Sequence, residues 1–132
     1  VKPMKEELTS YGFEDLATPE LLTEFLKKKG SSIIVINSVC GCAAGSCRPG
    51  VIKAYLNMTK KPDNIGTCFA GYDIEAIQLI RQKLAPYPPS SPAIALFKDG
   101  QVVHLVERYQ IEQSNYVTLA EHLLALTEKH FS

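Results

Sequence analysis

The sequence has no tryptophan, only four cysteines in 132 residues, and no excess of either charge. Lysine and arginine total 14, and so do aspartate and glutamate. This balance disfavours a nucleic-acid or anionic-membrane surface, because both need a positive excess. No apolar run approaches the roughly 20 residues of a membrane-spanning helix. Hydrophobic residues make up 45% of the chain, which is enough for a core, and the length predicts one compact domain over residues 1–132.

The few cysteines are crowded together. They lie at positions 40, 42, 47 and 68, so that three fall within eight residues. A small secreted scaffold would be richer in cysteine and would spread it along the chain. The first residues given, Val1–Lys5, do not resemble a secretory signal. Local crowding without such a signal predicts a redox or metal site rather than a framework of structural disulfides.

Hydrophobic periodicity and turn residues predict alternating helices and strands. We expect helices over residues 4–11, 18–30, 49–58 and 73–84 and from Ser114 or Asn115 onward, and strands over residues 33–36, 64–69, 93–97 and 102–106. Thr18 and Asp73 are the predicted helix caps, because their side chains can accept from backbone N–H groups, and Pro19 needs no donor in the first turn.

The order of these elements predicts the fold class. Asp99-Gly100 supplies the positive φ angles of a tight hairpin turn, so the last two strands should be antiparallel neighbours. The run Ile33–Ile36 is apolar without alternation, as in a strand covered on both faces. A βαβ half followed by a ββα half predicts an α/β fold with a central mixed sheet and helices on both faces.

The motif Cys40-Gly41-Cys42 lies directly after the buried strand and before a helix. N–H groups in the first turn of a helix stabilise a thiolate, and a cysteine placed there has a lowered pKa. Cys40 is nearer the exposed strand end, and Cys42 should lie further into the helix. We therefore predict that Cys40 is the nucleophile and Cys42 the resolving thiol.

A disulfide between Cys40 and Cys42 would close a small ring across one glycine. Such a ring does not reach the preferred torsion without distortion, which stores several kcal/mol. In a two-electron couple about 30 mV corresponds to about 1.4 kcal/mol, so roughly 4 kcal/mol of strain would raise a potential from about −270 mV to about −180 mV. We expect a centre that gives up its disulfide readily and resolves mixed disulfides or shuffles bonds.

The other two cysteines have alternative interpretations. Cys47 could be an accessory exchange thiol, a ligand in a metal set with Cys40 and Cys42, or a half-buried small residue, and we favour the last. Cys68 is predicted to be a buried thiol within a strand. Zinc or iron–sulfur sites need close to four thiolates or histidines, and we expect no metal here. The histidines lie far downstream, at His104, His122 and His130.

Ser91-Pro92 precedes the third predicted strand, where proline can only begin a strand because it has no N–H to donate. A cis bond would place the Ser91 backbone beside the cysteines, where its N–H and C=O could pair with a substrate chain. The base rate for an isolated X–Pro bond favours trans. The prediction of a cis bond therefore rests on topology.

The strand, the Cys-Gly-Cys motif, the helix and residues 91–100 together resemble a thioredoxin-like fold, a three-layer α/β/α sandwich. In that fold the redox cysteines open the first βαβ helix and a cis-proline faces them. Residues 35–45, Val-Ile-Asn-Ser-Val-Cys-Gly-Cys-Ala-Ala-Gly, are similar to the signature of the bacilliredoxin family. The same pattern is matched at Arg48-Pro49 and at residues 69–71, 89–92 and 102–104.

The resemblance implies a function. Bacilliredoxins are thiol–disulfide oxidoreductases that remove bacillithiol from mixed disulfides on cytosolic bacterial proteins. By resemblance, Cys40 attacks and takes over the bacillithiol, Cys42 helps to resolve it, and Gly41, Ser91 and Pro92 contact the substrate. Cys47 stands where a small apolar residue is expected, which leaves the resolving partner open.

The resemblance also implies the partners. We expect S-thiolated client proteins, a low-mass thiol such as bacillithiol as co-substrate, no cofactor, no nucleic-acid or membrane partner, and a cytoplasmic location. Some members of the family have been described as weak disulfide isomerases, so this activity is an alternative. A cysteine-based metal-binding module is the other alternative.

Overall fold

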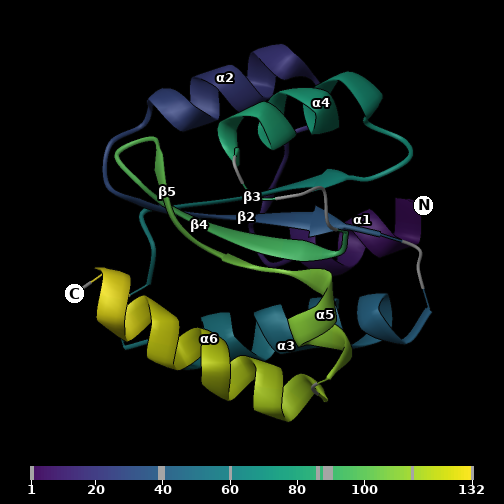
Figure 1. Ribbon diagram of the computed structural model, residues 1–132, viewed down its shortest axis with the longest axis vertical. Coiled ribbons are helices and arrows are strands. Elements are labelled where there is room, and N and C mark those ends of the chain that lie inside the picture. The colour runs from purple at the N-terminus through teal and green to yellow at the C-terminus, as the bar shows by residue number, and fades with distance from the viewer. Residues whose placement is uncertain are drawn as a thin grey trace.

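The sheet is built around β2 (Ser31–Asn37), a strand in which every residue is buried. Because side chains alternate between the two faces of a strand, such a strand needs cover on both sides. In the computed structural model, β2 lies inside a mixed sheet. It pairs in parallel with β3 (Asn64–Phe69) and antiparallel with β4 (Ala93–Lys98). The order of the described strands is β1-β3-β2-β4-β5, and β2 to β5 are labelled in Figure 1.

The structure describes residues 2–38, 41–59, 61–85, 87, 91–113 and 115–131. The outer strands are β1 (Glu14–Asp15) and β5 (Gln101–Val106). The helices are α1 (Lys2–Thr9), α2 (Pro19–Lys27), α3 (Gly41–Asn57), α4 (Ile74–Lys83), α5 (Arg108–Glu112) and α6 (Tyr116–Phe131). Within these described ranges, no helix is both long enough and apolar enough to cross a membrane.

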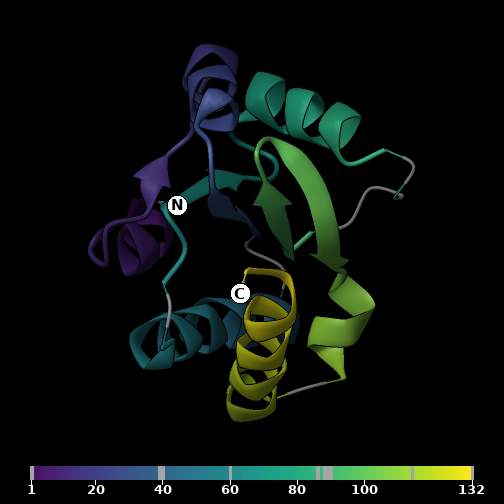
Figure 2. The ribbon, with the colours of Figure 1, turned by 90° about the vertical axis from the view of Figure 1, so that its left-hand side faces the viewer.

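The helices cover the two faces of the sheet in separate layers. One face carries α2 and α4, and the other carries α3, α5 and α6 (Figures 1 and 2). The side chains of β2 divide in the same way. Ile34 and Ile36 pack in the cluster beneath α2 and α4, whereas Ile33 and Val35 pack in the cluster shared by α3 and α6. The predicted α/β class and the three-layer arrangement are confirmed.

Several local predictions are also confirmed. The Thr18 hydroxyl accepts a hydrogen bond from the backbone N–H of Leu21 at 3.3 Å, so it caps α2. Asp99 and Gly100 have φ angles of 51° and 80°, as the tight turn between β4 and β5 requires. The short N-terminal helix is present as α1, and the four predicted strands appear as β2, β3, β4 and β5.

Two short elements were not predicted. β1 is an exposed edge strand in which Glu14 and Asp15 pair in parallel with β3. Their carboxylates form ion pairs with Lys28 and Lys5, at 2.9 and 3.3 Å. The other element is α5, a single short helix after β5. Neither segment is long enough to show a hydrophobic period, which explains why pattern analysis missed them.

Two predicted details need correction. The helix expected from Pro49 begins earlier, at Gly41, and continues through Pro49. A proline lacks the N–H that would bond to the carbonyl four residues before it, here Gly45, which lies on an exposed part of α3. Asp73 is the N-cap residue of α4, but its side chain makes no capping bond. Its carboxylate instead accepts from the backbone N–H of Phe69 and from Lys5.

His104 on β5 is a partly buried histidine that faces the last helix. Its ring centroid lies 5.6 Å from that of His130 on α6. Its Nε2 is buried and has no hydrogen-bond partner among the described residues. Burial, and after it the positive charges of His130, His122 and Lys129, lowers the pKa of His104 from its ordinary value. The folded protein therefore favours the neutral form of this ring.

We predict that His104 makes the protein less stable as the pH falls below about 6.5. The unfolded chain binds a proton at this histidine near that pH, whereas the folded chain resists protonation until the pH is lower. The free energy of unfolding therefore decreases across that interval. Urea unfolding at about pH 7.5 and about pH 5.5 measures the loss, which should be smaller in His104→Asn than in the parent.

His122→Asn is the matched control for this prediction. It removes a histidine from α6 that only contributes charge to the surroundings of His104, so most of the pH-dependent loss should remain. Equal losses in the parent and in His104→Asn would contradict the assignment of the acid sensitivity to His104.

Candidate active site

The candidate site lies at the edge of the sheet where the parallel strands β2 and β3 end. Asn37 and Phe69, the last residues of the two strands, are paired in register. The backbone N–H of Ala70 donates to the Asn37 carbonyl at 3.0 Å, which extends the pairing one residue further. Because parallel strands bring their carboxyl ends to one edge, the segments after Asn37 and after Phe69 lie close together.

The Cys-Gly-Cys motif follows β2 at this edge. Gly41 is the first residue of α3, so the motif opens the helix, as the resemblance to a thioredoxin-like fold implied. Cys40 lies outside the described residues, and Cys42 is described only by its backbone within α3. The N-terminal N–H groups of α3, a helix of 17 residues, therefore point out of this edge with their partial positive charge.

Ser91 and Pro92 lie at the same edge. β4 runs antiparallel to β2, and Ala93 at its start pairs with Ile36 near the end of β2. Pro92 precedes this pair and is buried, while Ser91 is half-buried. The Ser91-Pro92 peptide bond is cis, which confirms the expectation drawn from topology and resemblance. Gly41 and the Ser91-Pro92 pair are thus brought to one edge from two separate segments.

Arg48 is a buried cation at this edge that sequence reasoning did not single out. Its Nη1 donates to the Ser38 carbonyl and to Asn37 Oδ1, each at 2.9 Å. Its Nε donates to Glu7 Oε1 at 3.0 Å. In the sequence, Arg48 was noted only within the Arg48-Pro49 match to the family pattern, and it stands seven positions after Gly41, on the same face of the helix.

The first helix also contributes to this edge. Asn37 Nδ2 donates to the Met4 carbonyl at 3.2 Å, and Lys5 Nζ lies 3.0 Å from Asp73 Oδ1. Burial alone would lower the pKa of Lys5, but hydrogen bonds with Asp73 and Asp15 and the charges of these carboxylates raise it. Lys5 therefore stays protonated and links α1 to β1 and to the segment that follows β3.

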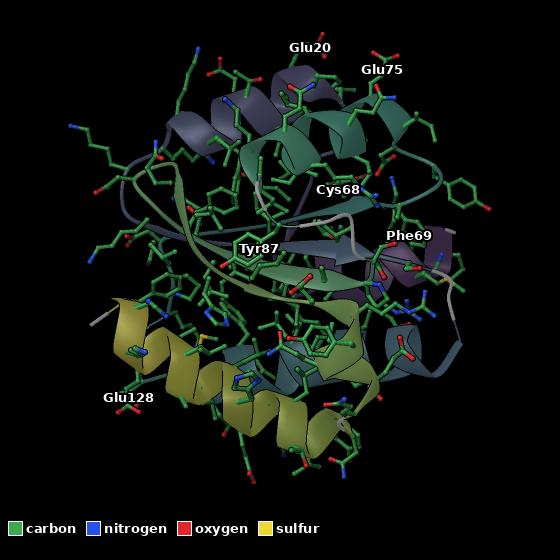
Figure 3. All side chains as sticks on the ribbon, viewed as in Figure 1. Glu20, Cys68, Phe69, Glu75, Tyr87 and Glu128 are labelled. Carbon is green, nitrogen blue, oxygen red and sulfur yellow. The ribbon has the colours of Figure 1, made fainter. Side chains whose placement is uncertain are left out.

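Cys47 and Cys68 lie on opposite faces of the sheet and are free thiols. Cys47 is fully buried in the cluster with α6. Cys68, which is labelled in Figure 3, is 1% exposed in the cluster with α4. Burial raises the pKa of each thiol to about 12. The positive charge of Arg48 lowers the pKa of Cys47, but this effect is smaller than that of burial. The buried thiol predicted for Cys68 is confirmed. The burial of Cys47 argues against a role as an accessory exchange thiol.

A metal or cofactor would need donors that converge. Among the residues that the structure describes, no group of three or more His, Cys, Asp or Glu side chains is arranged to hold a metal ion. In the alternative metal set of Cys40, Cys42 and Cys47, the first two side chains lie outside the described residues. Cys47 could join them only by leaving the core, where it is fully buried.

A cavity lies elsewhere in the molecule. Its volume is about 430 Å³, and Met58, Leu124 and Phe131 contribute its apolar lining. Met58 follows the C-terminal end of α3, which is the end opposite to Gly41. The cavity is therefore separate from the edge that carries the Cys-Gly-Cys motif.

We predict that Cys47 and Cys68 resist alkylation in the folded protein. A pKa of about 12 leaves about one thiol in ten thousand ionised at about pH 8, and the thiolate is the reactive species. Iodoacetamide should therefore label both residues at least about a thousandfold more slowly than a free cysteine peptide. Tandem mass spectrometry of digested protein measures the labelling at each position.

Protein unfolded in guanidinium is the control, because there both thiols should react at the rate of a peptide. Labelling of Cys47 at a peptide-like rate in the folded protein would contradict the prediction and restore Cys47 as an exchange thiol.

Comparison with known proteins adds the family. The model of a family described as "Disulphide isomerase" matches residues 1–131. A bacilliredoxin from Cytophaga hutchinsonii is 57% identical to this chain, with 93% of this chain and 90% of that protein covered. A bacilliredoxin from Geobacillus kaustophilus is 44% identical, with 98% of this chain and 90% of that protein covered.

Solved structures agree on the fold. Thioredoxin from Malassezia sympodialis is similar with a TM-score of 0.59 at 13% identity, and 92% of each chain is covered. Thioredoxin O2 from Arabidopsis thaliana, in its oxidised state, gives a TM-score of 0.58 at 15% identity, with 91% of this chain and 95% of that chain covered. At such identities the likeness concerns the fold alone. The family model and the sequence relatives show that this chain belongs to the bacilliredoxins, which are thiol–disulfide oxidoreductases with a thioredoxin-like fold.

Proposed function

We propose that this protein removes bacillithiol, or a similar low-mass thiol, from mixed disulfides on client proteins, with Cys40 as the nucleophile and Cys42 as the resolving thiol. The observation that carries the proposal is the position of Gly41, the central residue of the motif, as the first residue of α3 directly beyond the buried strand β2. A helix start at that point offers N–H groups and partial positive charge to a thiolate.

The first step is a thiol–disulfide exchange. The Cys40 thiolate attacks the bacillithiol sulfur of the mixed disulfide and forms a new disulfide with it. The bond to the client sulfur breaks, and the client cysteine leaves as a thiolate that takes up a proton from solvent. One disulfide is exchanged for another, so the client is reduced while Cys40 takes over the adduct.

The second step clears the adduct. The Cys42 thiolate attacks the Cys40 sulfur, a disulfide forms between the two cysteines, and bacillithiol leaves as a thiol. Two further low-mass thiols, or one dithiol reductant, then return both cysteines to the reduced state and are themselves oxidised to a disulfide. Because the two sulfurs are only one residue apart, this intramolecular disulfide is strained and easily reduced.

Ser91 and Pro92 supply the binding surface for the substrate backbone in this proposal. Their cis bond lies at the same edge as Gly41, and the half-buried Ser91 has main-chain groups that can pair with an extended segment. The proposal makes S-thiolated proteins and the low-mass thiol the partners of this chain, with no additional cofactor, and it places the reaction in the cytoplasm.

We predict that Cys40→Ser slows adduct release by about a hundredfold or more, because the variant lacks the attacking thiolate. Cys42→Ser should still free the client but should remain loaded with one bacillithiol on Cys40. A bacillithiolated or glutathionylated client, incubated with each variant and followed by intact-mass spectrometry, separates these two outcomes.

Cys68→Ala serves as the control, because it removes a buried thiol on the face opposite to Cys47 and leaves the motif intact. If Cys40→Ser released the adduct as fast as the parent does, the proposed function would be wrong.

Protein disulfide isomerisation is the second candidate, favoured by the printed description of the matching family model. It would use the same cysteines on a peptide disulfide laid along Ser91-Pro92. We predict that recovery of activity from scrambled ribonuclease stays near that of a small-thiol control, whereas release of a low-mass adduct is fast. Recovery well above the control, together with slow adduct release, would favour the isomerase instead.

A further inference from the structure

We propose that Arg48 is a positioning residue for Cys40 and that Glu7 on α1 moderates the influence of its charge. The proposal rests on the proposed role of Cys40 as the nucleophile. It deepens that role by assigning to the buried guanidinium both the placement of the strand end before Cys40 and part of the stabilisation of its anionic form.

The placement follows from the contacts of one guanidinium nitrogen. Arg48 Nη1 donates to the Ser38 carbonyl and to Asn37 Oδ1, each at 2.9 Å. The same Asn37 oxygen accepts from the Ser38 backbone N–H at 2.9 Å. Ser38 precedes Cys40 by two residues, and covalent geometry keeps their Cα atoms within about 7 Å of each other. Arg48 therefore fixes the backbone from which the Cys40 segment departs.

The charge of Arg48 acts in surroundings with little water. Its side chain is only 9% exposed, and a guanidinium stays protonated at any ordinary pH. Its carboxylate partner, Glu7, lies at 3.0 Å but is 45% exposed, so solvent screens the negative charge more than the positive one. A net positive potential therefore remains at the edge where Cys40 follows Ser38, and it adds to that of the α3 N-terminus.

Removing the charge of Arg48 and removing the charge of Glu7 should change the ionisation of Cys40 in opposite directions, which a purely structural role would not predict. Removing the Arg48 charge should make the Cys40 thiolate harder to form. Removing the Glu7 charge should make it easier to form, because the guanidinium is then less compensated. Gln at position 7 still offers an oxygen to the Arg48 Nε, so the hydrogen bond is kept while the charge is lost.

The experiment measures the alkylation rate of Cys40 against pH, by tandem mass spectrometry, in a Cys42→Ser background. We expect Arg48→Gln to raise the midpoint of the alkylation profile by about one pH unit, which corresponds to the Coulomb energy of two unit charges about 10 Å apart at an effective dielectric constant of about 20. Glu7→Gln should lower it by about half a unit, because the exposed charge is more strongly screened. Arg48→Lys keeps the charge and should recover most of the shift.

Matched controls remove the same charges elsewhere. Lys53→Gln takes one positive charge from an exposed position further along α3, and Glu24→Gln takes one negative charge from an exposed position on α2. Both should leave the midpoint where it is in the parent. If Arg48→Gln does not fold, Glu7→Gln still tests the proposal, because Glu7 is half-exposed and its substitution conserves the hydrogen bond.

Unchanged midpoints, or shifts of the same sign, in Arg48→Gln and Glu7→Gln would overturn this inference and leave the proposed function standing. Adduct release by Cys40→Ser at the parent rate would instead overturn the proposed function itself. The two failures are therefore distinguishable.

Discussion

The parallel pairing of β2 with β3 is the constraint on which the rest of the structure depends. It brings the carboxyl ends of both strands to one edge, where Asn37 pairs with Phe69. The antiparallel β4 then starts at that edge, so Pro92 arrives beside the residues that follow β2. The segments after β2, after β3 and before β4, which are distant in sequence, therefore meet at this edge. The directions of the strands therefore bring the Cys-Gly-Cys motif and Pro92 to the same edge of the sheet.

The sheet also separates the two buried cysteines from the Cys-Gly-Cys motif. Cys47 and Cys68 lie on opposite faces, each inside an apolar cluster, and burial raises the pKa of each thiol to about 12. The Cys-Gly-Cys motif instead stands at the edge, where a helix begins. The two buried thiols are therefore separated from each other by the sheet, and each is buried in a core cluster rather than at the edge that carries the motif.

Elements with a clear period or a known turn could be predicted from the sequence. The apolar run of β2, the Asp99-Gly100 turn and the Thr18 cap depend on local chemistry, and each was found as expected. The start of α3 was misplaced, because Pro49 is typical of a helix beginning and its tolerance inside α3 depends on the whole helix being packed. The local pattern alone could not show this.

Some residues of the candidate site could be predicted from the sequence, and others could not. Its cysteines and the Ser91-Pro92 pair were predicted from the motif and its position, whereas Arg48 was not. Arg48 reaches Glu7, 41 positions away in sequence, and Asn37, 11 positions away, and such contacts leave no periodic trace. Asp73 was expected to cap α4 but bonds to Phe69 and Lys5. The partner of such a carboxylate depends on which distant cation the fold brings beside it, and the local sequence does not show this.

The short strand β1 has a consequence for how this molecule meets other chains. It ends the β3 side of the sheet with two acidic residues whose carboxylates are held by Lys28 and Lys5. An incoming strand would have to displace these ion pairs and would find only a brief stretch of main chain to join. The short, charged edge of the sheet therefore disfavours the addition of a foreign strand, and with it edge-to-edge aggregation through β1.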